Sequence, residues 1–152
     1  MNKEVALEKM KAYCAYQERC QKEVQEKLFK LSIDTDIAEE ILIELITSNY
    51  LNEQRYAEAF VSGKFRIKGW GRIKIKQHLK QKHISDYCIK KGLNEIEESE
   101  YLTKIEAWVT KLNDKYNALN VFDRKGKIAQ RLTAKGFEAS LVWDVLNATN
   151  LS

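Results

Sequence analysis

The chain has 152 residues, 44% hydrophobic and 32% charged, and its 26 Lys and Arg against 22 Asp and Glu give a formal net charge of +4. This length suits one domain or a few small units, and the apolar content excludes a wholly disordered chain. Three cysteines without a CxxC spacing predict no disulfide framework. The lack of a long apolar run predicts no signal peptide and no membrane span, so we expect a soluble cytoplasmic protein.

The chain contains no proline, and its apolar residues recur at spacings of three and four, as in Ile37, Ile41 and Leu45. Both features are typical of uninterrupted amphipathic helices, so we expect an all-α fold. In chain order we expect helices at residues 3–18, 20–31, 35–48, 53–67, 71–82, 86–96, 98–119, 124–135 and 139–148. Asp34, Asn52 and Ser85 are expected N-caps, and Gly136 is an expected C-terminal glycine.

Apolar residues also recur at a much longer period. Val24, Leu28 and Ile33 are matched after 51 positions by Ile75, Leu79 and Ile84, and after a further 53 by Ile128, Leu132 and Phe137. Such a period predicts stacked supersecondary units. We therefore expect an elongated tandem array of three three-helix, helix-turn-helix-like repeats, at residues 1–50, 51–97 and 98–152, with tryptophans at or between the repeat cores. For Trp70 the sequence does not decide between a buried and an exposed position, because glycines flank it and cations surround it.

The middle repeat differs from the others in charge. Residues 64–91 hold ten Lys or Arg and a single acid, Asp86. Arg72, Lys76 and Lys80 fall at helical spacing, which predicts a cationic stripe that helix formation alone does not favour. The block indicates a surface for a polyanion or for an acidic protein groove, and the alternative is a solvated helix face. The candidate binding residues are Lys64, Arg66, Lys68, Trp70, Arg72, Lys74, Lys76, Lys80 and Lys82.

The sequence offers no catalytic or metal-binding constellation. His78, His83 and Cys88 are five residues apart, so one helix would point them in different directions. Paired acids such as Glu39 and Glu40 fall on polar helix faces, and no phosphate-binding glycine loop or nucleophile motif is present. We therefore expect no enzyme activity, no metal and no cofactor.

The segment from Leu51 to Ser85 resembles the central motif of the RecX family. The matching elements are Arg55-Tyr56-Ala57, Phe60-Val61, the basic run to Lys68, Gly69-Trp70-Gly71, Ile75, Leu79 and Lys82. Residues 127–146 resemble the later repeat of that family. Three positions depart from the family pattern: Asn52 replaces an acid, Lys64 replaces Arg, and His83 replaces Gly. Lys64 keeps a charge but cannot form a bidentate fork.

The resemblance implies a protein that binds in the groove of RecA–DNA filaments and inhibits the recombinase, ATPase and co-protease activities of RecA, within recombination, DNA repair and the SOS response. It also implies weak binding of single- or double-stranded DNA without sequence preference, and we expect a monomer. Two alternatives remain open. One is a sequence-specific helix-turn-helix DNA-binding protein, and the fact that only one of the three repeats is basic argues against it. The other is a helical adaptor that binds proteins alone.

Overall fold

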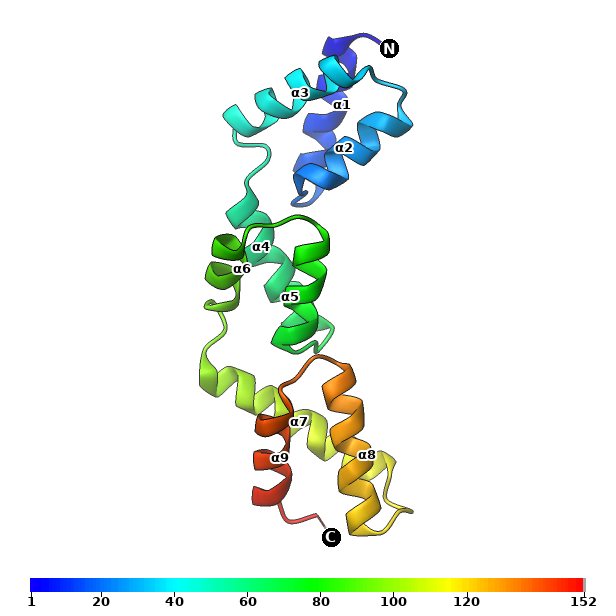
Figure 1. Ribbon diagram of the computed structural model, residues 1–152, viewed down its shortest axis with the longest axis vertical. Helices are drawn as coiled ribbons and strands as arrows, with labels where there is room; N and C mark the ends of the chain where they lie inside the picture. Colours follow the sequence, from blue (N-terminus) through cyan, green and yellow to red (C-terminus); the bar gives the residue numbers. More distant parts are fainter. Residues whose placement is uncertain (152) are drawn as a thin grey trace. The chain divides into compact units, whose positions relative to one another are not determined.

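A computed structural model describes residues 1–151, and over that range the chain forms helices and no strand (Figure 1). The all-α prediction is therefore confirmed. The helices are α1 (Lys3–Tyr16), α2 (Gln21–Lys30), α3 (Thr35–Thr47), α4 (Glu53–Ser62), α5 (Arg72–Gln81), α6 (Asp86–Leu93), α7 (Glu98–Lys115), α8 (Val121–Ala134) and α9 (Ala139–Ala148), and a π-helical turn, η1 (Gly63–Ile67), continues α4.

The helices pack into two compact units. An N-terminal unit comprises Met1–Phe60 and Leu79–Gly92, and a C-terminal unit comprises Val61–His78 and Leu93–Ser152. Each unit therefore takes part of the middle repeat. These units follow packing rather than sequence period, so the partition into repeats at 1–50, 51–97 and 98–152 stays a prediction.

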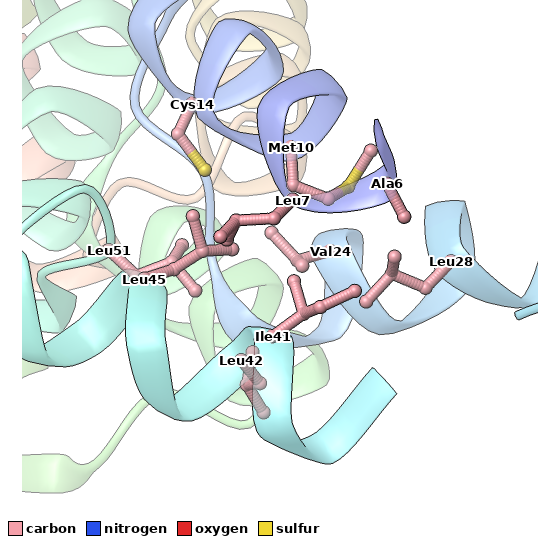
Figure 2. Packing of buried hydrophobic residues seen from close by; sticks show 10 residues of the cluster. All are labelled: Ala6, Leu7, Met10, Cys14, Val24, Leu28, Ile41, Leu42, Leu45 and Leu51. Carbon is pink, nitrogen blue, oxygen red and sulfur yellow. The ribbon is translucent and has the colours of Figure 1, made fainter. Parts of the chain in front are cut away.

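The N-terminal unit has a core in which α1 and α2 pack against α3 (Figure 2). Met10, Val24, Leu28, Ile41 and Leu45 are almost completely buried there. These residues recur every three or four positions along their helices, which is why one face of each helix is apolar. Burying side chains of this size stabilises the fold by roughly 1.5–3 kcal/mol each.

The C-terminal unit is built on α7, against which α8 and α9 pack. Tyr101, Ile105 and Val109 line the inner face of α7, while Ile128 and Phe137 close the core from the other side. Residues of the middle repeat also belong to this unit, and Val61, Phe65 and Ile75 have no exposed surface. Phe65 stacks on Tyr101 at 5.7 Å between ring centres.

The long-period repeat corresponds to one turn that occurs at the end of α2, α5 and α8. In all three, an amide bonds back to the carbonyl of a buried leucine: Ile33 to Leu28, Ile84 to Leu79, and Phe137 to Leu132. The residue just before each amide has a positive φ, and these residues are Ser32 (57°), His83 (61°) and Gly136 (96°). This is the Schellman end of a helix, in which two apolar residues meet across the turn. His83 thus adopts the turn that favours glycine.

The expected caps are present as well. The side chain of Asn52 accepts a hydrogen bond from the amide of Arg55 at 2.9 Å, and Ser85 Oγ accepts one from Cys88 at 3.2 Å. Asp34 accepts from Asp36 at 3.3 Å. The tryptophan prediction is wrong for Trp143, which is 39% exposed, whereas Trp70 and Trp108 are half-buried.

Candidate functional site

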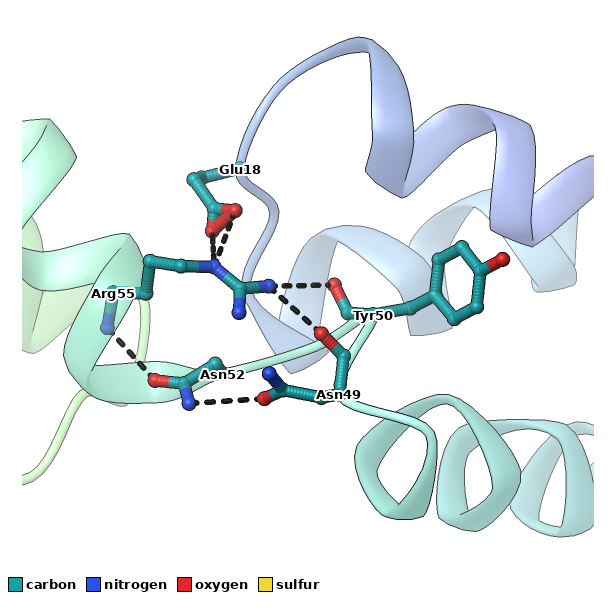
Figure 3. A network of polar contacts seen from close by, with 5 residues as sticks. All are labelled: Glu18, Asn49, Tyr50, Asn52 and Arg55. Atoms are coloured by element: carbon teal, nitrogen blue, oxygen red, sulfur yellow. Dashed lines mark hydrogen bonds and ion pairs between the residues drawn. The ribbon is translucent and has the colours of Figure 1, made fainter.

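The motif Arg55-Tyr56-Ala57 forms a joint between the first and middle repeats (Figure 3). Arg55 Nε lies 2.6 Å from a carboxylate oxygen of Glu18, and a terminal nitrogen of its guanidinium donates to the carbonyls of Asn49 and Tyr50. Tyr56 and Ala57 are buried. A guanidinium can make these contacts at once because its donors point in a fixed fork. The motif therefore has a structural role within the N-terminal unit.

The motif Gly69-Trp70-Gly71 joins the middle and third repeats within the C-terminal unit. The amide of Gly71 donates to the carbonyl of Lys135 at 2.8 Å, and the amide of Ile73 donates to that of Gly136 at 2.9 Å. A Cβ atom on Gly71 would lie 2.3 Å from the carbonyl carbon of Gly136. The two backbones can therefore approach this closely only because glycine occupies both positions.

Gly69 makes a second contact in the same joint. It has φ +69°, and its carbonyl accepts a hydrogen bond from Trp108 Nε1 at 3.1 Å. A Cβ atom there would lie 2.8 Å from the Trp108 indole. Both glycines of the motif are thus explained by close packing against the third repeat.

Between the first and middle repeats, the corresponding segments do not pack closely, and we call this contact the open joint. Cys20 and His83 occupy the positions that Gly71 and Gly136 hold in the other joint, and Cys20 donates its amide to Glu23 instead. A cavity of about 760 Å³ remains, lined by residues that include Arg19, Lys22 and Lys82. Each of these two positions carries a side chain, whereas the corresponding positions of the other joint are both glycine.

Two of the predicted binding cations are engaged in ion pairs with the third repeat. Arg66 donates from Nε and from a terminal nitrogen to the two carboxylate oxygens of Glu100, at 2.8 and 3.0 Å. The hydrogen bonds from Arg66 hold the pKa of Glu100 below its usual value, and they raise the pKa of Arg66. A bidentate pair of this geometry fixes the guanidinium in one orientation.

Arg72 is held more firmly than Arg66. Its guanidinium lies 3.1 Å from Glu98 and 3.0 Å from Glu138, and 3.7 Å from the centre of the Tyr101 ring. The Tyr101 hydroxyl accepts a hydrogen bond from the backbone amide of Arg72 at 3.0 Å, and it donates one to the carboxylate of Glu138. Burial, followed by the hydrogen bond to Glu138, raises the pKa of Tyr101. The predicted cationic stripe Arg72–Lys76–Lys80 therefore includes one residue, Arg72, that packs against the third repeat.

The other predicted residues lie closer to solvent. Lys68 and Lys76 are exposed in the C-terminal unit, and in the N-terminal unit Lys80 is exposed, 4.0 Å from Asp86, while Lys82 lines the open joint. Lys64 and Lys74 extend over the Trp70 ring, at 4.8 and 4.2 Å from its centre. The His78 ring lies 4.6 Å from the same indole. Trp70 thus has two ammonium groups over its ring and an imidazole beside it.

Sequence reasoning missed a second indole with the same surroundings. Lys111 and Lys135 lie over Trp108, at 5.2 and 4.3 Å from its ring. The spacing of Trp108, Lys111 and Lys115 on α7 could have indicated this face, since all three share one side of a helix. Lys135, at the end of α8, is brought there by the packing of α8 against α7, a contact that no local sequence pattern encodes.

Comparison with known proteins identifies the family of this chain. A sequence profile described as "RecX, second three-helix domain" matches residues 52–93. A protein named "Regulatory protein RecX" from Streptococcus uberis is 36% identical over 133 residues, which cover 86% of this chain and 50% of that protein. A crystal structure of RecX from Lactobacillus salivarius matches with a TM-score of 0.85 and 27% identity, over 96% of this chain and 95% of that one. The chain belongs to the RecX family.

Further RecX relatives agree with this assignment. The "Regulatory protein RecX" of Lactococcus lactis subsp. cremoris is 34% identical over 91% of this chain and 53% of its own length. Another structure, "Crystal structure of regulatory protein RecX", matches with a TM-score of 0.88 and 25% identity, over 97% of this chain and 73% of that one. The chain spans about half the length of the curated RecX proteins that it matches.

The RecX profile covers the middle repeat, including both of its joints. Residues 52–93 hold Arg55, Gly69 and Gly71, each of which contacts a neighbouring repeat. Over residues 1–151, no cluster of three His, Cys, Asp or Glu side chains is placed to hold a metal ion. Over the same residues, no helix is both long and apolar enough to cross a membrane.

Proposed function

We propose that this protein is a regulator of the RecA recombinase that binds RecA–DNA filaments and lowers their activity. The observation that supports the proposal is the similarity to proteins named "Regulatory protein RecX" over 86% of the chain, including the basic middle repeat. The proposal assigns no catalytic step to the chain. Regulation then comes from binding, because the protein stabilises whichever filament state it binds more tightly.

The geometry separates the basic residues into two groups. Arg66 and Arg72 are held by acids of the third repeat, so their charge is largely neutralised within the fold. Lys68 and Lys76 are exposed, and they are therefore the residues of the original set best able to contact DNA or an acidic RecA surface in the C-terminal unit. Lys80 and Lys82 have that role in the N-terminal unit. Several weak contacts of this kind add together when one protein spans neighbouring protomers.

RecA ATPase activity on single-stranded DNA tests the proposal. We expect the protein to lower ATP hydrolysis by cognate RecA when present below one copy per RecA protomer. The variant K68A/K76A should require more protein for the same inhibition. A matched control is K9A/K30A, which removes two positive charges from the first repeat. Unchanged ATPase activity at an equimolar ratio would contradict the proposal.

A protein-binding adaptor is the second candidate. A cavity of about 790 Å³ between α8 and α9 is lined partly by Phe122, which is 86% exposed, and by Trp143. Exposed aromatic residues of this kind are common where proteins bind each other. If the protein is such an adaptor, it should bind RecA in the absence of DNA, and F122S should weaken that binding. If the contact depends on DNA, the protein should not bind RecA when DNA is absent.

A further inference from the structure

Positive charge gathers in the C-terminal unit at a place outside the predicted basic block. Lys111 and Lys135 lie over the Trp108 ring, and Lys115 follows Lys111 on the same side of α7. Arg131 precedes Lys135 by one turn of α8. Two helices of the third repeat thus bring four cations close to one another, two of them over the Trp108 indole.

The joint with the middle repeat adds a fifth cation. The backbone bond from Ile73 to Gly136 brings the start of α5 against the end of α8, so that the Lys74 Cβ would lie only 2.4 Å from a Cβ on Gly136. Lys74 then extends over Trp70, at 4.2 Å. Gly69 lies between the two indoles, because it precedes Trp70 in the chain and bonds to Trp108. We call Lys74, Lys111, Lys115, Arg131 and Lys135 the junction cluster.

The junction cluster carries charge that the fold does not neutralise. Among the ion pairs found within residues 1–151, none involves any of its five members. Burial, followed by repulsion from Arg131, Lys74, Lys111 and Lys115, lowers the pKa of Lys135. Repulsion of this kind opposes folding, so packing alone does not account for the arrangement. The Arg66 and Arg72 sites show that acids are placed beside cations elsewhere in the same unit.

We propose that the junction cluster binds the phosphodiester backbone of a nucleic acid strand. A row of phosphates would supply the missing negative charge, with several single ammonium groups each contacting one phosphate. An acidic protein segment fits less well, because protein contacts rely on accessible aromatic and apolar anchors, and here the indoles are covered by lysines. The inference rests on the proposed function, in which the protein acts on DNA-containing filaments, and it locates the DNA contact.

The covered indoles also determine how the strand is recognised. A base can stack only on an accessible aromatic face. Ammonium groups lie over both Trp70 and Trp108, so the rings position charges rather than bases. Phosphate contacts carry no sequence information. The junction cluster is therefore expected to bind single and double strands of any sequence.

Binding of fluorescein-labelled DNA by the full chain, followed by anisotropy over a series of salt concentrations, tests the inference. The test variant is K111Q/K135Q, and the control is K125Q/K127Q, which removes the same charge from the first half of α8. Each lost phosphate contact should reduce the slope of log affinity against log salt by roughly 0.7 on single strands and 0.9 on duplex. We therefore expect the test variant to lower the slope by about 1.4 and 1.8 respectively, and the control to retain it.

Stability and a second pair of variants complete the test. K111Q/K135Q relieves repulsion, so its melting temperature without DNA should equal or exceed that of the parent. K115Q/R131Q should weaken DNA binding in the same manner, which keeps the test valid if the first variant folds poorly. DNA binding by both variants equal to that of the control would overturn the inference. So would displacement of DNA by polyglutamate at equal charge concentration, since that would indicate an acidic protein partner.

The outcome is separable from that of the proposed function. Inhibition of RecA ATPase by the parent protein measures the proposed function, whereas naked-DNA affinity of the variants measures the junction cluster. If the parent protein fails to inhibit RecA ATPase while the junction-cluster variants bind naked DNA more weakly than the control variant, the RecA proposal alone is rejected.

Discussion

At the scale of single residues, the glycines of the middle repeat act through the atoms they lack. Gly69 and Gly71 allow the backbone to approach Trp108 and Gly136, respectively. Gly63, only six residues before Gly69, has no atom within 4 Å of where its Cβ would be. The same residue type therefore has a strict packing requirement at two positions and none at the third.

Substituting alanine at these positions should separate the two cases. Gly71→Ala places a methyl group 2.3 Å from the backbone of Gly136 and disrupts the bonds to Lys135 and Gly136. We expect it to lower the free energy of unfolding by about 2–4 kcal/mol. Gly63→Ala should be neutral or stabilising by up to about 1 kcal/mol, because alanine favours helical backbone. Urea denaturation followed by circular dichroism measures both, and equal stability of the two variants would refute the close-packing account.

The sequence predicted the importance of these glycines only through the family resemblance. Gly136 was expected from its place after a helix, and its positive φ confirms that expectation. The contact of Gly71 with Gly136 joins residues 65 positions apart, and no local pattern encodes such a pair. For His83 the departure from glycine changes the residue but not the turn, since the hydrogen bonds of the turn are the same as in the other repeats.

At the scale of helices, α5 carries cations with different roles. Arg72 begins the helix between Glu98, Glu138 and Tyr101, and its side chain is 25% exposed. Lys76, one turn later, is exposed, and no ion pair within residues 1–151 includes it. Equal spacing along a helix thus does not give equal environments.

Single substitutions should reveal this difference. Arg72→Ala leaves the Glu138 carboxylate without its guanidinium partner and removes the guanidinium from the face of the Tyr101 ring. We expect it to lower the free energy of unfolding by about 1–3 kcal/mol. Most of this loss comes from Glu138, because Glu98 is 60% exposed and its pair is screened by solvent. Lys76→Ala should change stability by less than about 0.5 kcal/mol. Thermal melts of the two variants provide the measurement, and a neutral Arg72→Ala would mean that the contacts of the Arg72 guanidinium contribute nothing to stability.

Helix positions were predictable where a helix has its own periodic apolar face. The observed bounds of α3, Thr35–Thr47, and α9, Ala139–Ala148, lie within one residue of the expected 35–48 and 139–148. The predicted helix 53–67 instead ends in a π-helical turn, which places Phe65 in the core while Arg66 faces Glu100. The acids that pair with Arg66 and Arg72 belong to the third repeat, so the basic block could not be divided into structural and solvent-facing cations from sequence.

At the scale of the whole molecule, the middle repeat depends on its neighbours. Residues 61–78 pack with the third repeat, whereas residues 79–92 pack with the first. A repeat of about 50 residues buries only a modest share of its surface and is marginally stable alone. The sequence period therefore marks a unit of structure that is not expected to be a unit of stability.

A fragment comprising residues 1–97 tests this dependence. It lacks Tyr101, Trp108 and Gly136, so Phe65 loses its stacking partner and Gly69 and Gly71 lose their hydrogen bonds. We expect amide hydrogens of residues 61–78 to exchange with solvent at least 100-fold faster than in the full chain, roughly the effect of losing 3 kcal/mol of local stability. The core of α1, α2 and α3 is complete within the fragment and is its internal control, since Val24, Ile41 and Leu45 keep their neighbours. Exchange measured by NMR gives both regions in one experiment. Protection of residues 61–78 equal to that in the full chain would show that the middle repeat folds without the third, and the joint at Gly71 would then be a contact between finished repeats rather than a condition for folding.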